Sequence, residues 1–377
     1  MSLIPLSRPY IAGRELELVA NVVQSRRWAG DGEQTRRATQ LLAARVGGGT
    51  PMLTTSCSHA LEMAALLLDL APGDEVIVPA FTFVTTASAF ALRGARPVFV
   101  DIRPDTLNLD ERLLPAAITP RTRAIIPVHY GGVACAMDVI TEVAAAANAT
   151  VIEDNAHGLF GTWRGKPLGS LGRLATQSFH ESKNISCGEG GALVINDPAL
   201  VDRAEVLREK GTNRTRFFRG EVDRYTWVDL GSSYLPSELL AAVLVAQLEA
   251  ADAIQAARRR IWATYATNLA SWAERTGVRL PVVPADCVHP AHLFYLVLPD
   301  LARRTVLLDH LRARGVFATF HYQPLHLSEY AERWGGKPGD LPVTERIADT
   351  LIRLPLYPDL DERDQARVVE AVTSFVP

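Results

Sequence analysis

Short apolar segments alternate with segments of helical spacing along the first half of the chain. The apolar segments from Pro51 onward are expected to be strands, and they lie at Met52–Thr55, Val76–Val78, Pro97–Val100, Ala124–Val128 and Thr150–Glu153. The segments between them place apolar residues three and four positions apart, which predicts helices. Strands that are apolar throughout and alternate with helices predict an α/β fold, with a mostly parallel sheet covered on both faces.

The pattern loosens after Asp154. We expect a hairpin around Gly165, then strands at 175–179 and 192–195, the second of them antiparallel. A long irregular segment at 211–233 is rich in arginine and aromatic residues, and loops of that length usually bind something or reach a partner subunit. Helical spacing runs from Pro236 to about Trp272, as a spine between two domains.

The sequence predicts a large domain over residues 1–250, which begins with a helical arm, and a smaller C-terminal α+β domain over residues 251–377. In the smaller domain we expect strands at 292–298 and 318–322 and helices at 303–314 and 362–375.

Composition narrows the classes of function. A net charge of −3 offers no basic surface for nucleic acid or an anionic membrane. Residues 1–10 lack the cationic and apolar parts of a signal peptide, and 239–254 is too polar and short to span a bilayer. Four widely spaced cysteines and nine histidines show no CxxC or HExxH spacing. We therefore expect a cytoplasmic protein with reduced thiols and no metal site.

Lysine is rare in this chain, and one lysine stands out by its position. The four lysines are Lys166, Lys183, Lys210 and Lys337. Two lie in turns and one follows a charged helix, whereas Lys183 lies between an apolar strand and the glycine-rich stretch that begins at Gly188. A partly desolvated amine can form a Schiff base. The alternative is an ordinary surface lysine in a loop.

Polar and aromatic residues follow the ends of the predicted strands, where α/β sheets bind their ligands. Ser56–His59 begin a helix that could hold a phosphate, or the serines could simply cap it. Phe83 could stack on a flat ring or belong to the core. Asp154 could pair with a protonated ring nitrogen or cap a turn. Ser178 ends the strand before Lys183. Together these residues predict pyridoxal 5′-phosphate (PLP) chemistry.

Four stretches resemble the DegT/DnrJ/EryC1/StrS sugar aminotransferases over nearly the whole chain. They are residues 54–61 (TTSCSHAL), 79–83 (PAFTF), 153–157 (EDNAH) and 178–191 (SFHESKNISCGEGG). The resemblance implies the aspartate aminotransferase fold, type I, and homodimers whose active sites lie at the interface. Further stretches at 72–76, 93–95, 103–106, 128–130, 208–214, 225–227 and 231–235 resemble family members that make dTDP-4-amino-4,6-dideoxygalactose.

The resemblance also implies a role for each site residue. Lys183 would bind the cofactor aldehyde and move the proton during turnover, and Asp154 would pair with the pyridine nitrogen. The remaining cofactor contacts would come from Ser58, His59 (through its backbone N–H), Phe83, His157 and Ser178. The sugar side would include Tyr322 and His326, with a weaker indication for Gly30 and Asp31.

One position departs from the family pattern. Many members have Gly-x-Asn-Tyr-Arg where this chain has Ser233 and Leu235 in place of the asparagine and arginine. The asparagine contacts the cofactor phosphate of the neighbouring subunit, so Ser233 is a candidate for the same contact.

The resemblance implies transamination of dTDP-4-keto-6-deoxy-D-glucose with L-glutamate as donor, through the pyridoxamine form of the cofactor. Three alternatives remain open at this point. One is a C3-aminotransferase, because it would share every cofactor residue. The others are a catalytically silent regulatory relative and a Schiff-base aldolase without a cofactor.

Overall fold

A seven-stranded sheet forms the centre of the larger part of the molecule. The computed structural model describes residues 3–376, so Met1, Ser2 and Pro377 lie outside the description, including two residues of the segment without a signal-peptide pattern. The strands follow the order β1-β9-β8-β5-β4-β2-β3. Their bounds are β1 (Thr50–Thr54), β2 (Glu75–Pro79), β3 (Arg96–Val100), β4 (Thr122–Ile125), β5 (Thr150–Asp154), β8 (Leu174–Ser178) and β9 (Gly191–Ile195).

Only β9 runs against the other strands of this sheet. It pairs antiparallel with both β1 and β8, whereas the pairs β2–β3, β2–β4, β4–β5 and β5–β8 are parallel. The expected α/β fold and the antiparallel strand near residue 192 are confirmed. The carboxyl ends of β1, β2, β5 and β8 therefore meet at one edge of the sheet.

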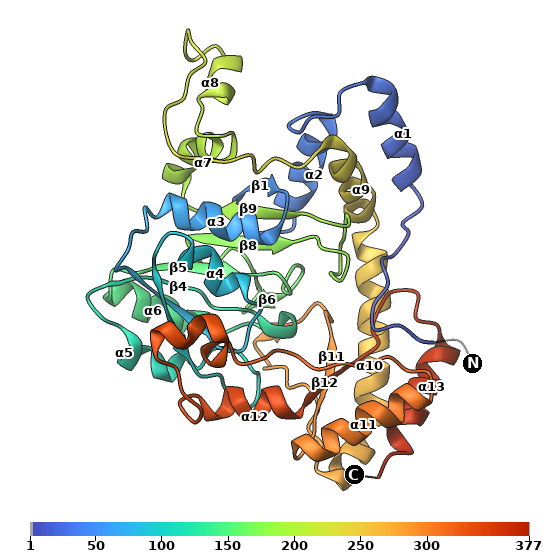
Figure 1. The fold of residues 1–377 in the computed structure, drawn as a ribbon. Helices are drawn as coiled ribbons and strands as arrows, with labels where there is room; N and C mark the ends of the chain where they lie inside the picture. The colour runs from blue at the N-terminus through green and yellow to red at the C-terminus, as the bar shows by residue number, and fades with distance from the viewer. Residues whose placement is uncertain (1–2, 377) are drawn as a thin grey trace.

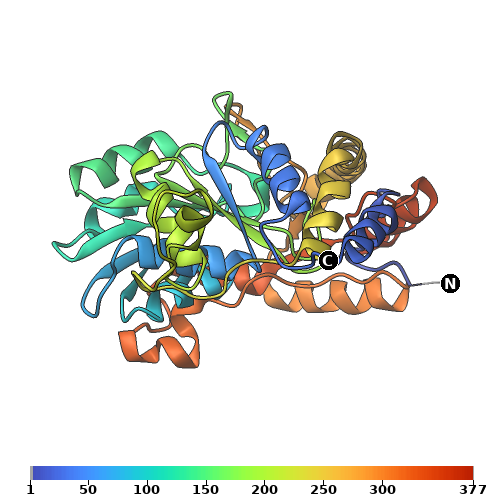
Figure 2. The same ribbon diagram turned by 90° about the horizontal axis from the view of Figure 1, so that it is seen from above.

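Helices cover both faces of this sheet (Figures 1 and 2). One face packs on α3, α4 and α7, and the other on α1, α2 and α9 at one side and α5 and α6 at the other. Because both faces are buried, the strands need apolar residues throughout. The helix bounds are α1 (Glu15–Ser25), α2 (Glu33–Ala43), α3 (Cys57–Leu67), α4 (Thr85–Ala91), α5 (Leu114–Ala117), α6 (Met137–Ala146), α7 (Val201–Arg208) and α9 (Glu238–Glu249).

The predicted hairpin around Gly165 is present. Its strands are β6 (Thr162–Trp163) and β7 (Lys166–Pro167), and β10 (Cys287–Val288) joins them as a third strand. The segment 211–233 contains the short helix α8 (Arg214–Phe218) and otherwise irregular chain, and it projects from the body of the molecule at the upper left of Figure 1.

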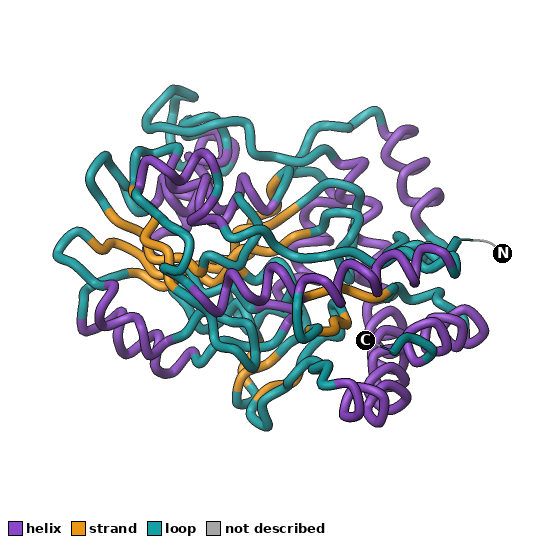
Figure 3. The backbone as a smooth tube through the Cα atoms, turned by 60° about the horizontal axis from the view of Figure 1, so that its bottom comes forward, coloured by secondary structure: helices purple, strands orange, loops and turns teal. Residues whose placement is uncertain are grey.

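The C-terminal part has its own core around a two-stranded sheet. That core packs α10 (Ala251–Thr276), α11 (Leu301–Ala313) and α13 (Glu362–Thr373) against β11 (Phe294–Val297) and β12 (Leu351–Leu354). The helix α12 (Pro342–Thr350) precedes β12. Figure 3 shows strands gathered inside and helices around them in both parts. The boundary at residue 250 stays a prediction.

Two predicted elements of the C-terminal half are wrong. The segment 318–322 makes a single bridge, from Thr319 to Arg353, because β12 takes the place beside β11 that we expected it to occupy. The alternating apolar residues that suggested a strand instead carry His321 and Tyr322 into a pocket.

The spine is likewise not one helix. Helices α9 and α10 meet at Ala250 with an angle of 62°. Since α9 packs on α1 and α2 while α10 packs in the C-terminal core, the bend comes from tertiary packing. Within residues 3–376, no single helix is long and apolar enough to cross a membrane, and only this bent pair passes the test of length and composition.

Candidate active site

A pocket of about 650 Å³ opens at the carboxyl edge of the sheet, between the two parts of the molecule. It brings together most of the site residues predicted from sequence. Those that line it are Ser58, Phe83, Asp154, His157, Ser178, Lys183 and Tyr322. The C-terminal part adds side chains that the sequence did not mark as site residues, and these are His292, His321 and Arg353.

Asp154 is held in a fixed orientation at the end of β5. Its Oδ2 accepts a hydrogen bond of 2.7 Å from the hydroxyl of Thr86, which in turn lies 2.9 Å from the hydroxyl of Thr82. Its Oδ1 accepts from the backbone N–H of Ala156 at 3.2 Å. A buried carboxylate with both oxygens oriented can pair with a positive ring nitrogen in the pocket.

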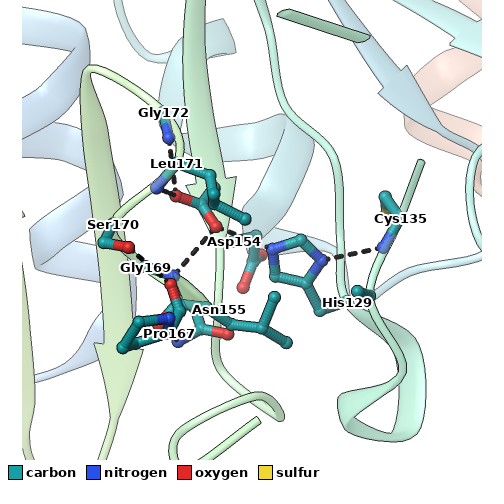
Figure 4. Close-up of polar contacts among 12 residues, drawn as sticks. His129, Cys135, Asp154, Asn155, Pro167, Gly169, Ser170, Leu171 and Gly172 are labelled. Atoms are coloured by element: carbon teal, nitrogen blue, oxygen red, sulfur yellow. Dashed lines mark hydrogen bonds and ion pairs between the residues drawn. The ribbon is translucent and has the colours of Figure 1, made fainter. Parts of the chain in front are cut away.

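The residue before Asp154 anchors this strand end from behind. The Glu153 carboxylate is fully buried and accepts from the backbone N–H groups of Gly169, Leu171 and Gly172 at 2.7–2.8 Å (Figure 4). It also lies 2.9 Å from Nε2 of His129.

The tautomer of His129 follows from its other contact. Its Nδ1 accepts from the Cys135 N–H at 3.1 Å, so the proton is on Nε2 and is donated to Glu153 (Figure 4). The backbone N–H of His129 also donates to the carbonyl of Asp154 at 3.3 Å. The sequence marked Glu153 only as the neighbour of a site residue, and this anchoring network was missed.

Lys183 lies in the pocket, three residues after a turn held by its own N–H bond to the His180 carbonyl at 2.9 Å. Burial lowers the pKa of the Lys183 amine, and the nearby charge of Arg353 adds to this, although Cys57 and Asp154 act in the opposite direction. A lowered pKa increases the share of neutral amine, which is the nucleophilic form.

The glycine-rich stretch after Lys183 allows a close approach of two backbones. A Cβ on Gly191 would overlap the backbone of Ser56 and Cys57 at the start of α3. Only glycine therefore lets β9 pack beside this helix N-terminus, next to Ser178 at the end of β8.

At that helix N-terminus, capping and anion binding share the available groups. Ser56 caps α3, because its Oγ accepts from the His59 N–H at 3.1 Å. The N–H groups of Cys57 and Ser58 then have no acceptor inside the helix. The His59 ring lies outside the pocket lining, against the hydroxyl of Thr55 and the ring of Tyr234.

Three histidines and Tyr322 form one wall of the pocket. His157 stacks on His292 with ring centroids 4.2 Å apart, and His321 stacks on Tyr322 at 3.8 Å. Burial lowers the pKa of all three histidines well below 6.5, and the charge of Lys183 acts in the same direction. The three rings are therefore neutral. The Gly131 N–H donates to His157 Nδ1 at 3.3 Å, so His157 carries its proton on Nε2.

Asn184 connects the lysine loop to the C-terminal part. Its amide nitrogen donates to the Pro290 carbonyl at 2.8 Å, so its oxygen accepts from His292 Nδ1 at 2.9 Å. From α10, Arg258 donates to the carbonyls of Ala291 and His292. These contacts fix the tautomer of His292 and hold its ring against His157.

Five predicted site residues lie outside the pocket lining of this chain. Asp31 pairs with Arg208 at 2.8 Å, and the neighbouring Gly30 packs under Pro236. His326 is buried against Glu345 at 3.1 Å. Ser233 bridges to Glu209 on the projecting segment, and His59 was described above. No finding tests their roles, which stay predictions.

The residues missed by sequence reasoning share one property. Thr86, His292 and Arg353 lie far from Lys183 along the chain, and their local sequences resemble ordinary helix or strand. His321 had one signal, its place beside Tyr322 in a polar aromatic segment. Within residues 3–376, no group of three His, Cys, Asp or Glu side chains is arranged to hold a metal ion.

Comparison with known proteins gives consistent matches over the whole chain. A model of the DegT/DnrJ/EryC1/StrS aminotransferase family matches residues 9–373. The spore coat polysaccharide biosynthesis protein SpsC of Bacillus subtilis (strain 168) is 32% identical, over 99% of this chain and 97% of that protein.

Solved structures agree. DesV from S. venezuelae is 31% identical with a TM-score of 0.91, covering 100% of both chains. A putative sugar aminotransferase, Spr1654 from Streptococcus pneumoniae, has been solved in its PLP and PMP forms. The PMP form is 26% identical with a TM-score of 0.91 over 98% of each chain.

Proposed function

This chain belongs to the DegT/DnrJ/EryC1/StrS aminotransferase family, and from that premise we propose that it aminates C4 of dTDP-4-keto-6-deoxy-D-glucose. The product would be dTDP-4-amino-4,6-dideoxy-D-galactose, with L-glutamate as the amino donor. The coarser statement needs no proposal, because the family makes the chain a PLP-dependent sugar aminotransferase. The observation that carries the proposal is a low-pKa lysine in one pocket with an oriented aspartate.

The residues of the pocket fit the cofactor. Hydroxyls of Ser58 and Ser178 and two free N–H groups of α3 suit a phosphate, and Gly191 leaves room for it beside the sheet. When bound, PLP supplies an aldehyde for an amine and a ring that withdraws electrons from the carbon next to the substrate nitrogen.

Each side chain then has a defined task. Lys183 holds the cofactor covalently and, once released, moves a proton between the two carbons that exchange the amino group. Asp154 keeps the pyridine nitrogen positive. His157 donates its Nε2 proton toward the ring substituents, and Phe83, which is 56% exposed, offers a free face for stacking on the ring.

The choice of C4 over C3 rests on sequence likeness within the family and on the polar wall of the pocket. The C3-aminotransferase remains the second candidate, because the cofactor residues would serve both reactions. Incubating the enzyme with each keto sugar and L-glutamate, followed by NMR of the product, separates the two. A product aminated at C3, or amination of the C3 ketone alone, would overturn the C4 assignment.

We further propose a cytoplasmic homodimer. Support for the dimer comes from the aromatic residues exposed on the projecting segment, which Ser233 ends. Support for the compartment comes from the four cysteines, none of which forms a disulfide. Both proposals can be checked on the purified protein and on fractionated cells.

The deciding experiment is an absorbance spectrum of the purified enzyme with and without L-glutamate. We expect a visible cofactor band that moves to the near-ultraviolet position of the aminated cofactor. A protein without this band, even after addition of PLP, would contradict the function. A silent regulator would show the band but no change with any amino donor, and an aldolase would stay colourless.

A further inference from the structure

Arg353 is a cation in the pocket without an anionic partner. It lies in β12, and its side chain lines the pocket beside His321 and Tyr322. One Nη donates weakly to the Phe320 carbonyl at 3.4 Å, and the buried Nε has no hydrogen-bond partner. Within residues 3–376 no carboxylate lies in ion-pair distance of it.

Other arginines of this chain satisfy their donors. Arg203 bonds to the carboxylates of Asp69 and Asp229, and the buried Arg258 donates to two backbone carbonyls. A buried N–H group without an acceptor costs free energy. The arrangement at Arg353 therefore lacks an acceptor that a bound molecule could supply.

Arg353 acts on the same place as the reactive lysine. Its charge lowers the pKa of the Lys183 amine and of all three pocket histidines. The guanidinium thus lies close to the atoms where the amino group is exchanged. In this neutral wall it is the group that can recognise an anion.

We propose that Arg353 binds the α-carboxylate of the amino donor. The assignment rests on the proposed aminotransfer, and it names the substrate class as α-amino acids. The planar guanidinium can donate two parallel hydrogen bonds to a carboxylate. Such a pair would satisfy the Nε donor that the protein leaves open.

The other anion that enters this pocket under the proposed function is the diphosphate of the sugar nucleotide. Its distance from the reacting carbon argues against it. In an α-amino acid the carboxylate is attached to the carbon that loses the nitrogen. In the sugar, the ring separates the C4 ketone from the diphosphate at C1. An anion site beside Lys183 therefore suits the carboxylate.

The test measures the two half-reactions separately by absorbance of the cofactor. Arg353→Gln removes the charge, Arg353→Lys keeps the charge without the planar fork, and Arg346→Gln is a control on the exposed side of α12. In the first half-reaction the PLP form is titrated with L-glutamate. In the second, enzyme loaded with the aminated cofactor is titrated with the keto sugar nucleotide.

We expect Arg353→Gln to raise the apparent Kd for L-glutamate about 10- to 100-fold. Its second half-reaction with the sugar should stay within about threefold of the wild type. Arg353→Lys should recover part of the loss, and Arg346→Gln should match the wild type. A carboxylate-free amine such as isopropylamine should react equally with wild type and variant.

A second readout does not depend on turnover. Binding of the unreactive dicarboxylate maleate is measured by calorimetry, with thermal melting as a check on folding. Maleate should bind the wild type and bind Arg353→Gln at least about tenfold more weakly. Equal binding of maleate, or a loss confined to the sugar nucleotide, would overturn the assignment. A wild type that binds maleate through Arg353 yet accepts no amino donor would instead refute the proposed function.

Discussion

Single side chains in this pocket owe their chemistry to burial. Burial lowers the pKa of Lys183 and of three histidines, so an amine is activated inside a wall of neutral rings. Asp154 is the counterpart, since Thr86 and Ala156 orient both of its oxygens. The sequence located Lys183 and Asp154 because each follows a strand, but pKa values depend on neighbours from distant segments.

Replacing Lys183 by alanine tests the central residue. We expect Lys183→Ala to lose the visible cofactor band and to reduce turnover by roughly 10²- to 10⁴-fold or more, because the proton-transfer group is lost. Lys166→Ala, in the exposed turn between β6 and β7, is the matched control and should keep both. Turnover of Lys183→Ala at the wild-type rate would refute the mechanism.

The neutral histidines predict a pH dependence of stability. Their folded-state pKa values lie below the unfolded value of about 6.5, so the unfolded chain binds more protons as the pH falls. Stability is therefore fully present above pH 6.5 and is lost below it. Each histidine contributes up to about 1.4 kcal/mol per pH unit in that range.

The measurement is denaturant unfolding of the protein at pH 7.5, 6.5 and 5.5. His157→Gln removes one titrating group, so it should make the fall between pH 6.5 and 5.5 less steep by up to one proton. A free energy of unfolding that stays level over this range would contradict the neutral assignment.

Among the secondary-structure elements, the end of β5 depends most on a buried network. Four hydrogen bonds converge on Glu153, three from the backbone of the loop 169–172 and one from His129. Since Asp154 is the next residue, the network holds the aspartate at the floor of the pocket. Local sequence shows two acidic residues in a row, but it does not show which one is turned inward.

We expect Glu153→Gln to destabilise the protein by about 3 kcal/mol or more, because an amide group would face buried N–H donors and the partner of His129 would be lost. The variant should also bind PLP more weakly, as the end of β5 is released. Glu181→Gln, on the exposed loop before Lys183, is the control. Unfolding midpoints and PLP titrations of the three proteins give the comparison, and an unchanged midpoint for Glu153→Gln would refute the anchoring role.

Sequence periodicity worked best for elements whose both faces are buried. Strands β2 to β5 are short apolar runs between turns, and their positions were predicted within a few residues. The bend between α9 and α10 carries no glycine or proline, so no local signal marks it. The segment 318–322 has the alternation of a strand, but β12 already pairs with β11 and displaces it.

At the scale of the whole molecule, the pocket is assembled from segments that lie hundreds of residues apart. Strand ends of the large sheet supply Asp154, Ser178 and Lys183, and the C-terminal part supplies Tyr322 and Arg353. Residue types at strand ends could be predicted because parallel strands share one edge. The opposite wall could not be predicted, since it depends on how two cores pack together.

The projecting segment 211–233 is the feature of the whole molecule that the single chain leaves unexplained. Phe218 and Trp227 are 73% and 76% exposed, although aromatic residues of this size are usually buried. Covering one such side chain contributes about 1.5–3 kcal/mol. We expect a second copy of this chain to cover them in the proposed dimer, where Ser233 would approach the partner's cofactor.

The double variant Phe218→Ser, Trp227→Ser tests this arrangement. Loss of two buried aromatic contacts should weaken the dimer by at least about 100-fold, which sedimentation of the protein at low micromolar concentration would show as monomer. Activity should fall with the fraction of dimer and recover at high protein concentration. Val306→Ser, at a 57% exposed position on α11, should leave both unchanged. A wild type that sediments as a monomer, or a double variant that stays dimeric, would assign these aromatic residues to another task.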